Sequence, residues 1–481
     1  MEIDAATLFN YLGKRYEEAY IGSYNLKEMV NIAMKGLKPG SRVLDVGCGT
    51  GRPVAEMLAN AGHDVYGIDV AEEMVKIASD QVRGTFQQAD MRTYKPSQPM
   101  DAVFAVYSLY QISPSDIYSL VYRFSEWLRD GGILVLGSTP STSLQSGEGR
   151  YDPVWGCVRG IVKPWMTRTT KETLLSEEGW QSLLESAGFS IQAEKAFKYT
   201  PNDQDHRVTE VHYLIVARKT VSQPLFAPYP LPRSCPGARS HHDPTWRYLL
   251  DRLVFDEGRE LVLDSLKHSQ KTLDVGGGFC CTSVMSCSDE PADMSTLALV
   301  ANSSTPKAIE SIPTLSQTLP FPDKCFDSAV AMLTLDFVND PKKSLQELTR
   351  VVDSSTTSSR IVIAQGAPEN ECLKLMNSLC VPRSAERPQH NHQGYLLLTA
   401  EQVMFEMGFG AVSVHRVDSH YEFNSKGDEA AKALAGLWYH DDPGYGKMKT
   451  ALVPHVQDLF DDHKNVLRNE LVVLVAQPTP N

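Results

Sequence analysis

The stretch VLDVGCGTGRPVAEMLANAGHDVYGIDVAEEMVKIA, residues 43–78, decides the fold. It opens with a short β-rich run that ends in glycines, and a helical pattern follows over about residues 52–61. The next run, HDVYGID at 63–69, alternates apolar residues as a strand does, and a second helical pattern follows it. This order of strand, glycine loop, helix, strand and helix is typical of a parallel sheet covered by helices.

The glycines of this loop, Gly47, Gly49 and Gly51, have the spacing Gly-x-Gly-x-Gly. Without side chains they let a ligand approach the backbone, and the start of the following helix favours an anionic group. A dinucleotide fingerprint would need a third glycine at position 52, where Arg52 stands. Asp69, at the end of the next strand, is placed to accept hydrogen bonds from ribose hydroxyls. The pattern therefore disfavours a dinucleotide-dependent enzyme that transfers hydride, but it is still compatible with a ligand that contains a nucleoside.

With these motifs, residues 10–220 resemble a class I S-adenosylmethionine-dependent methyltransferase of the group that acts on small molecules. The resemblance implies that S-adenosylmethionine is bound here and leaves as S-adenosylhomocysteine. It implies support of the methionine end by Asp45, ribose binding by Asp69 and adenine contacts after the second and third strands. The cofactor residues implied in this way are Tyr16, Asp45, Gly47, Gly49, Gly51, Asp69, Val70, Asp90, Met91 and Tyr107.

The rest of the first half continues the alternation of strands and helices. The last two strand patterns are joined by a short segment and predict an antiparallel pair at one edge of the sheet. Ser113 followed by Pro114 marks the start of a helix. The predicted strands are 85–89, 101–108, 133–138, 190–197 and 210–219, and the predicted helices are 114–129 and 176–188.

The second half repeats this plan. KTLDVGGGF at 271–279 matches RVLDVGCGTG, and SRIVIAQG at 359–366 matches GGILVLGS. A proline-rich segment separates the two copies, because proline disfavours helices and inner strands. We therefore predict an α/β protein of two tandem Rossmann-like methyltransferase folds, each a mostly parallel seven-stranded sheet with helices on both faces. The predicted parts are a cofactor-binding domain at 1–220, a linker at 221–242 and a degenerate domain at 243–481.

The second copy departs from the pattern at the cofactor side. Gly276 and Gly278 match the first two glycines, but Cys280 replaces the third, and Asn302 stands where the acidic residue is expected. We predict that this domain binds no cofactor and serves as a structural, substrate-pocket or oligomerisation domain. A further helical stretch is predicted at about 427–467.

The acceptor side of the first half is less specific. His212, near the start of the last strand, is the candidate general base or acceptor contact, and the alternative is a strand histidine that only makes hydrogen bonds. His206 precedes it. The long connection 138–176 is predicted to be a lid or a packed surface loop. Its large side chains are the candidate walls of the substrate pocket: Tyr151, Trp155, Trp165 and Met166.

Composition narrows the classes of function. The net charge of −13 disfavours a large nucleic-acid surface, which needs a basic face. None of the nine cysteines forms a CxxC pair, so no metal site is expected. The amino terminus lacks the pattern of a signal peptide, and no apolar run has the length of a membrane span. A cytoplasmic protein without membrane or nucleic-acid partners is expected, either a monomer or a homodimer.

The sequence thus favours an enzyme that methylates an oxygen or nitrogen of a small organic molecule, with secondary metabolism as the expected setting. Two alternatives stay open. One is an enzyme of this fold that uses the bound cofactor for a cyclisation or rearrangement without methyl transfer. The other is a scaffold or regulatory protein, against which the intact loop and Asp69 argue.

Overall fold

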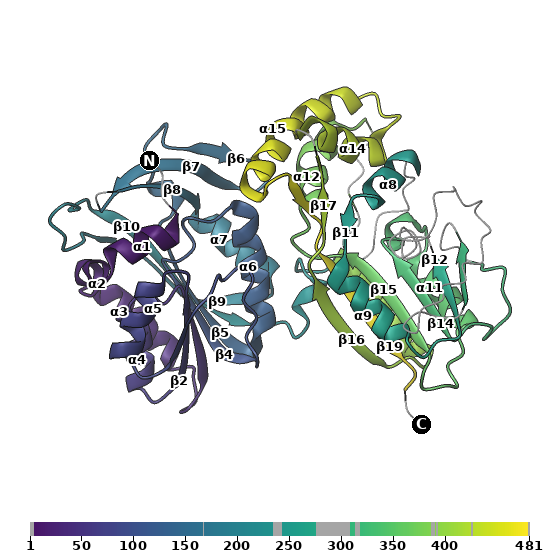
Figure 1. The fold of residues 1–481 in the computed structure, drawn as a ribbon, viewed down its shortest axis with the longest axis horizontal. Helices are drawn as coiled ribbons and strands as arrows, with labels where there is room; N and C mark the ends of the chain where they lie inside the picture. Colours follow the sequence, from purple (N-terminus) through teal and green to yellow (C-terminus); the bar gives the residue numbers. More distant parts are fainter. Residues whose placement is uncertain are drawn as a thin grey trace. The chain divides into compact units, whose positions relative to one another are not determined.

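The structure is a computed structural model that describes residues 4–166, 168–233, 243–275, 308–312, 318–385, 390, 393–424 and 427–479. The chain divides into two compact units, Met1–Pro224 and Leu225–Asn481, which we call the first and second domains (Figure 1). Across the described ranges, no helix has the length and apolar character needed to span a bilayer.

The first domain is built on a seven-stranded sheet with the order β3-β2-β1-β4-β5-β10-β9. The pairs from β3 to β5 are parallel, and β10 pairs antiparallel with both β5 and β9. The antiparallel edge agrees with the sequence prediction. The strands are β1 (Arg42–Val46), β2 (Asp64–Asp69), β3 (Thr85–Gln88), β4 (Met100–Val106), β5 (Leu128–Ser138), β9 (Phe189–Tyr199) and β10 (Glu210–Lys219).

Helices cover both faces of this sheet. Figure 1 shows α3, α4 and α5 on one face and α6 and α7 on the other. The predicted start of α6 is confirmed, because Ser113 Oγ accepts a hydrogen bond from the backbone N–H of Asp116 at 3.1 Å and Pro114 follows it. The helices are α1 (Ala5–Leu12), α2 (Lys14–Tyr20), α3 (Tyr24–Met34), α4 (Val54–Asn60), α5 (Glu72–Gln81), α6 (Pro114–Trp127) and α7 (Glu177–Ser186).

Apolar side chains between the helices and the sheet fix the position of the loops. Leu26, Met29 and Val30 of α3 pack with Leu58 of α4 against Phe104 of β4, and all are buried. Because parallel strands end at the same edge, this packing brings the ends of β1, β2 and β4 together.

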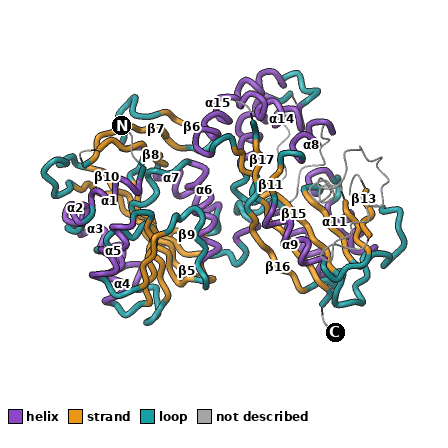
Figure 2. Tube along the Cα trace, in the orientation of Figure 1, coloured by secondary structure: helices purple, strands orange, loops and turns teal. Residues whose placement is uncertain are grey.

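The connection 138–176 is not a loop, and this part of the prediction is wrong. It folds into a separate antiparallel sheet of three strands in the order β6-β7-β8, shown in Figure 2. Its strands alternate buried and exposed residues, but Gly160 and Pro164 interrupt the apolar pattern that would reveal them. The strands are β6 (Arg150–Asp152), β7 (Cys157–Trp165) and β8 (Arg168–Leu175).

The second domain repeats the sheet, with six described strands in the order β13-β12-β14-β15-β19-β16. Here too the early strands are parallel, and β19 is antiparallel to both its neighbours. The strands are β12 (Lys271–Val275), β13 (Ala308–Ile312), β14 (Ser328–Met332), β15 (Arg360–Gly366), β16 (Ala411–Val417) and β19 (Leu471–Gln477). Gly276, Gly278, Cys280 and Asn302 lie outside the described residues.

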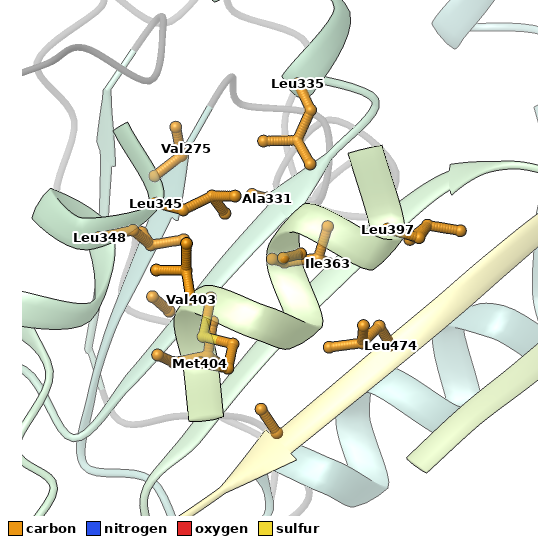
Figure 3. Close-up of a cluster of buried hydrophobic side chains, with 14 of the residues drawn as sticks. Val275, Ala331, Leu335, Leu345, Leu348, Ile363, Leu397, Val403, Met404 and Leu474 are labelled. Atoms are coloured by element: carbon orange, nitrogen blue, oxygen red, sulfur yellow. The ribbon is translucent and has the colours of Figure 1, made fainter. Parts of the chain in front are cut away.

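Two helices and the sheet form the core of the second domain. In Figure 3, Leu345 and Leu348 of α11 and Val403 of α13 lie with the strand residues Ala331 and Ile363 in one buried cluster. The helices and short helical turns of this domain, apart from α14 and α15, are η2 (Pro224–Phe226), α8 (Asp243–Leu250), α9 (Asp256–Leu266), η3 (Leu335–Phe337), α11 (Pro341–Val351), α12 (Glu371–Leu375), η4 (Met376–Cys380), η5 (Val381–Arg383) and α13 (Gln393–Glu406).

The stretch predicted to be helical at 427–467 contains two helices, α14 (Gly427–Tyr439) and α15 (Tyr445–His463). Its last residues are a strand instead, β18 (Val466–Arg468), because Lys464 takes a left-handed conformation with φ 57° that ends α15. With β11 (Leu253–Val254) and β17 (His420–Glu422), β18 forms a small antiparallel sheet.

Candidate functional site

The glycine loop after β1 has a conformation that only glycine adopts without strain. The φ angles of Gly47, Gly49 and Gly51 are 70°, 53° and 81°. A Cβ atom on Gly47 would lie 2.3 Å from Cβ of Ser108, and one on Gly51 would lie 3.0 Å from Cγ2 of Val82. The loop therefore has no room for side chains at two of these positions, and its backbone stays close to the end of β4.

Asp69 ties this loop to the end of β2. Its two carboxylate oxygens accept hydrogen bonds from the backbone N–H groups of Gly49 and Ala71, each at 2.9 Å. A carboxylate offers about four acceptor positions, so both oxygens can still accept bonds from a ligand. Asp69 thus shapes the loop and keeps the capacity to bind a diol.

Asp45 is the second buried carboxylate of the site, at the end of β1. Burial raises its pKa to about 7, and the nearby charge of Asp69 adds to the effect. A cationic group placed beside Asp45 would favour its ionised form. The two carboxylates and the glycine loop therefore fit a positively charged ligand that also carries a diol, as S-adenosylmethionine does.

The predicted adenine contacts lie at the ends of β2 and β3. Val70 and Met91 are partly buried. The Asp90 carboxylate accepts hydrogen bonds from the backbone and the guanidinium of Arg92, which hold its pKa below the usual range. Asp90 is thus engaged by a neighbouring side chain in this structure.

Helix α2 is fixed against the glycine loop. Glu17 accepts a hydrogen bond from Nε2 of Gln81 at 2.8 Å, and the same amide bonds to the carbonyl of Thr50. A guanidinium nitrogen of Arg52 lies 3.5 Å from Glu17. These contacts place the ring of Tyr16 next to the glycine loop. A Cβ atom built on Gly49 would lie 4.0 Å from that ring.

A pocket that is open to solvent lies where α2, the β4–α6 connection, β7, β8 and β10 meet. Lys163 and Glu172 form an ion pair of 2.8 Å in its wall. The aromatic side chains that line it are Phe9, Tyr16, Tyr20, Tyr107, Tyr110 and Trp165, and the other lining residues include Gln111, Thr139, Glu210 and His212.

Glu210 connects the polar side chains of this pocket through its hydrogen bonds. It accepts hydrogen bonds from the Tyr20 hydroxyl at 3.1 Å and from Trp165 Nε1 at 3.2 Å. The Nε2 atoms of His206 and His212 each lie 2.9 Å from one of its oxygens. Burial acts to raise the pKa of Glu210, but the bonds and charges of the two histidines outweigh it and hold the pKa at about 2.

Two polar atoms in this pocket's lining residues are left without partners. Because an ionised Glu210 can only accept, His212 donates through Nε2, and Nδ1 is an acceptor when it carries no proton. This Nδ1 and the Tyr107 hydroxyl are buried and have no hydrogen-bond partner within the described parts of the chain. Their rings lie 4.6 Å apart between centroids. Buried polar groups are nearly always paired, so both atoms are candidates to bind a ligand.

Tyr107 also has an unusual backbone. Its φ is 60°, a region that residues other than glycine rarely adopt. Its N–H donates to the carbonyl of Gly137 at 2.9 Å, which fixes the turn after β4. Strained residues of this kind concentrate at functional sites.

The predicted substrate residues separate into two groups. Trp165 lines the pocket as expected. Trp155 is buried instead against Tyr118, whose hydroxyl donates to its carbonyl at 2.9 Å, and Met166 is buried in the core with residues of α1 and α2. Tyr151 is exposed. Tyr151 lies on β6, whereas Trp155 and Met166 lie in the turns that flank β7, and these positions take the three side chains away from the pocket lining.

Sequence reasoning missed Glu210, Tyr20 and Tyr110. Glu210 stands two residues before His212 on a strand, so the two share a face of the sheet. That spacing could have identified the pair. The bonds from Tyr20 and Trp165 could not be foreseen, since these residues are 190 and 45 positions away.

Comparisons with known proteins agree with this geometry. Family profiles described as "Methyltransferase domain" match residues 43–132 and, separately, residues 284–356. Phosphoethanolamine N-methyltransferase 3 of Arabidopsis thaliana is 33% identical over 135 residues, 25% of this chain and 27% of that protein. The 27-O-demethylrifamycin SV methyltransferase of Amycolatopsis mediterranei is 29% identical over 177 residues, 35% of this chain and 61% of that protein.

The chain thus spans only part of the length of these relatives. Among solved structures, the PH0226 protein of Pyrococcus horikoshii is 19% identical, with a TM-score of 0.32 over 42% of this chain and 94% of that one. The two profile matches fall one in each half, as the duplicated sheet requires. The chain belongs to the class I S-adenosylmethionine-dependent methyltransferase family and carries two methyltransferase-like domains in tandem.

Proposed function

We propose that the first domain is an S-adenosylmethionine-dependent methyltransferase that methylates an oxygen or nitrogen of a small organic molecule. The observation that carries the proposal is the pocket beside the glycine loop, in which His212 Nδ1 and the Tyr107 hydroxyl are buried without partners. The relatives named above are O- and N-methyltransferases of small molecules by their names, which supports the same class of acceptor.

The cofactor side is assigned to the loop and its carboxylates. Asp69 would hold the ribose diol, and Asp45 would face the positively charged methionine end. Tyr16 covers the loop from α2, and Val70, Asp90 and Met91 are assigned to the adenine. When bound, the cofactor supplies a methyl group that bonds to the acceptor while the electrons of the broken C–S bond pass to sulfur.

The residues of the pocket have to orient the acceptor and remove its proton. Methyl transfer is an in-line displacement, so holding donor and acceptor in line supplies much of the rate. An acceptor hydroxyl or ammonium must also lose a proton. His212 Nδ1 receives it, and Glu210 holds the ring in place through Nε2 and stabilises the charge that forms. The aromatic walls exclude water.

The remaining parts of the chain take other roles in this proposal. The second domain binds no cofactor, and the segment 221–242, where it begins, is the linker to the first domain. Specialised metabolism is the proposed setting, supported by the name of the rifamycin relative. We also propose that the chain is cytoplasmic and is a monomer or a homodimer.

The experiment measures S-adenosylhomocysteine and the methylated product after incubation of the whole chain with S-adenosylmethionine and a panel of phenols and primary amines. Both products should appear together for at least one acceptor. The Asp69→Ala variant should lose cofactor binding in calorimetry, and so should Gly49→Val, whose side chain would need a rare backbone conformation.

Two results would oppose the proposal. If both variants stay folded and bind the cofactor as tightly as the parent chain, the assignment of the loop fails. If an acceptor is converted without formation of S-adenosylhomocysteine, the chain performs the cyclisation or rearrangement that the sequence left open.

A further inference from the structure

The carboxylates in the acceptor pocket of the first domain are already engaged by the protein. Four side chains donate to Glu210 at distances of 2.9 to 3.2 Å: Tyr20, Trp165, His206 and His212. A carboxylate offers about four acceptor positions, so these donors fill them. Glu172, also in the lining, forms its ion pair with Lys163 at 2.8 Å. A substrate ammonium group would therefore have to displace a donor that the protein already supplies.

Two buried polar atoms of the same lining have no partner: the Tyr107 hydroxyl and Nδ1 of His212. Neither has a hydrogen-bond partner within the described ranges, and their ring centroids lie 4.6 Å apart. Buried polar groups are nearly always paired. One ligand group that bonds to both atoms would complete the site, so its chemistry is set by what these two atoms require.

The Tyr107 hydroxyl requires an acceptor. Burial raises its pKa well above the usual value, and the nearby Tyr16 and Glu210 add to the effect, so the hydroxyl keeps its proton at neutral pH. A hydroxyl can also accept a hydrogen bond, but its own proton then stays unpaired. Because an unpaired buried donor is costly, the ligand has to present a lone pair to Tyr107.

His212 sets the second requirement, and both protonation states of Nδ1 lead to the same ligand atom. When Nδ1 carries no proton it accepts, so the ligand has to donate to it. When Nδ1 carries a proton it donates, so the ligand has to accept from it. A hydroxyl group fits the first state. The ionised oxygen that remains after the hydroxyl proton has passed to Nδ1 fits the second state.

A neutral amine does not meet both requirements. Its nitrogen has one lone pair, which the methyl transfer uses, and no lone pair is then left for Tyr107. A hydroxyl oxygen has two lone pairs, one for the new bond and one for the Tyr107 donor. The difference of one lone pair favours an oxygen acceptor in this pocket.

The walls of the pocket indicate which kind of molecule carries the hydroxyl. Aromatic side chains make up much of the lining. The rings of Tyr107 and Tyr110 are nearly parallel, with an angle of 6° between their planes, and aromatic rings pack well against such faces. A phenol also loses its proton at about pH 10, as the tyrosine side chain does, so it suits a histidine base better than an aliphatic alcohol does.

We propose that the acceptor of the first domain is an aromatic hydroxyl group, and that Tyr107 selects it over an amine by donating to the acceptor oxygen. The proposal rests on the methyltransferase function proposed above and narrows its acceptor to oxygen. The oxygen forms a C–O bond with the methyl group, its proton passes to His212 Nδ1, and the electrons of the broken C–S bond stay on sulfur.

Binding tests this selection without turnover. Calorimetry on the whole chain compares 4-butylphenol with 4-butylaniline, which has nearly the same size and is also uncharged at neutral pH. The phenol should bind at least about fivefold more tightly, which is the cost of one unpaired buried donor. Tyr107→Phe removes that donor, so the ratio should fall to about twofold or less.

Tyr110→Phe is the matched control in the same pocket. The Tyr110 hydroxyl already has a partner, Oγ1 of Thr139 at 3.4 Å, so it requires nothing from the ligand. This variant should keep the preference for 4-butylphenol at about the ratio of the parent chain. A preference that survives Tyr107→Phe, or that Tyr110→Phe removes instead, would overturn the proposal.

A molecule that carries both groups on one ring gives a second measurement. With 4-aminophenol, the parent chain should form mainly 4-methoxyaniline together with S-adenosylhomocysteine, and Tyr107→Phe should shift the products towards methylation of nitrogen. Chromatography against the two standards measures the ratio. Faster methylation of 4-butylcyclohexanol than of 4-butylphenol would contradict an aromatic acceptor.

Failure of this proposal differs from failure of the proposed function. Methylation of the 4-aminophenol nitrogen by the parent chain, with S-adenosylhomocysteine formed, would overturn the selection of oxygen and leave the methyltransferase function intact. If no probe is methylated or Tyr107→Phe does not fold, the binding of the two butyl probes to the parent chain decides. Equal binding, or none, would overturn the proposal.

Discussion

Asp45 and Asp69 end neighbouring strands and share one buried environment, so they do not ionise independently. The raised pKa of Asp45 follows from burial first and from Asp69 second. A cation beside Asp45 would oppose both effects, because an opposite charge favours the ionised carboxylate. The free site is therefore held partly protonated near neutral pH.

This predicts that the affinity for S-adenosylmethionine depends on pH. Binding of the cation requires the ionised Asp45, whose pKa in the free chain is about 7, so affinity should rise as the pH rises through that value. From pH 6 to pH 8 the dissociation constant should fall by about tenfold. Calorimetry at constant ionic strength measures it. Asp45→Asn should bind weakly with little pH dependence, and an unchanged slope in that variant would assign the effect to another group.

The histidines of the pocket allow a matched comparison of single residues. Both bond to Glu210, but only His212 lines the pocket. His212→Asn should lower kcat by about a hundredfold, in the range of a lost general base. His206→Asn should lower kcat by less than about threefold, since this change removes only one hydrogen bond to Glu210.

Cofactor affinity measured on the same two variants separates chemistry from folding. Both should bind S-adenosylmethionine within about twofold of the parent chain, because neither histidine contacts the glycine loop. Equal losses of kcat in the two variants would mean that His212 only packs the strand.

At the scale of elements, α2 is the part that joins the cofactor loop to the acceptor pocket. Glu17 points to the loop side, through Gln81 and Arg52, while Tyr20 points to Glu210. A short helix of this kind has little stability of its own and depends on such contacts.

Glu17→Ala should therefore weaken cofactor binding by about threefold to tenfold, the worth of one or two hydrogen bonds. Glu18→Ala is the control, because Glu18 is the neighbouring acidic residue and is exposed. Binding is measured by calorimetry, and thermal unfolding checks the fold. If the two variants bind equally well, the contacts of Glu17 do not hold the loop.

The elements of the main sheets could be predicted because each is a clear apolar pattern. The run 42–46 and the pair at 190–197 and 210–219 were found close to their observed bounds. The strands at 157–165 and 168–175 were not, since glycine and proline interrupt one and charged residues fill the other. These strands are stabilised by pairing with a neighbouring strand and not by their own composition. A local sequence pattern does not reveal strands of this kind.

For the whole molecule, the duplication could be predicted because both copies keep residues that fix the strands of the sheet. Asp101 accepts from the backbone N–H of Arg42 at 2.8 Å, and Asp327 accepts from that of Lys271 at 3.1 Å, as the aligned repeat implies. The pocket of the first domain could not be foreseen, nor could a second pocket in the second domain. One gathers residues as distant as Phe9 and His212 and the other residues as distant as Trp246 and Asn469, and the sequence gives no measure of the space between them.

The number of cofactor sites is a property of the whole chain. Cys280 and Asn302 lie outside the described residues, so their effect remains the sequence prediction: a thiol crowds the loop and an amide replaces the ribose-binding carboxylate. We expect one S-adenosylmethionine per chain in calorimetry, and none after Asp69→Ala. A stoichiometry near two, or one remaining site in the variant, would show that the second domain also binds the cofactor.

The small sheet of β6, β7 and β8 is an insertion in the first domain. In the chain it lies between β5 of the main sheet and α7, which covers that sheet. It contributes Lys163, Trp165 and Glu172 to the acceptor side, whereas Asp45, the glycines and Asp69 all precede it. Substrate range can therefore drift, or be re-engineered by exchanging this small sheet between homologues, provided that the contacts of Trp165 and Met166 with α2 are kept.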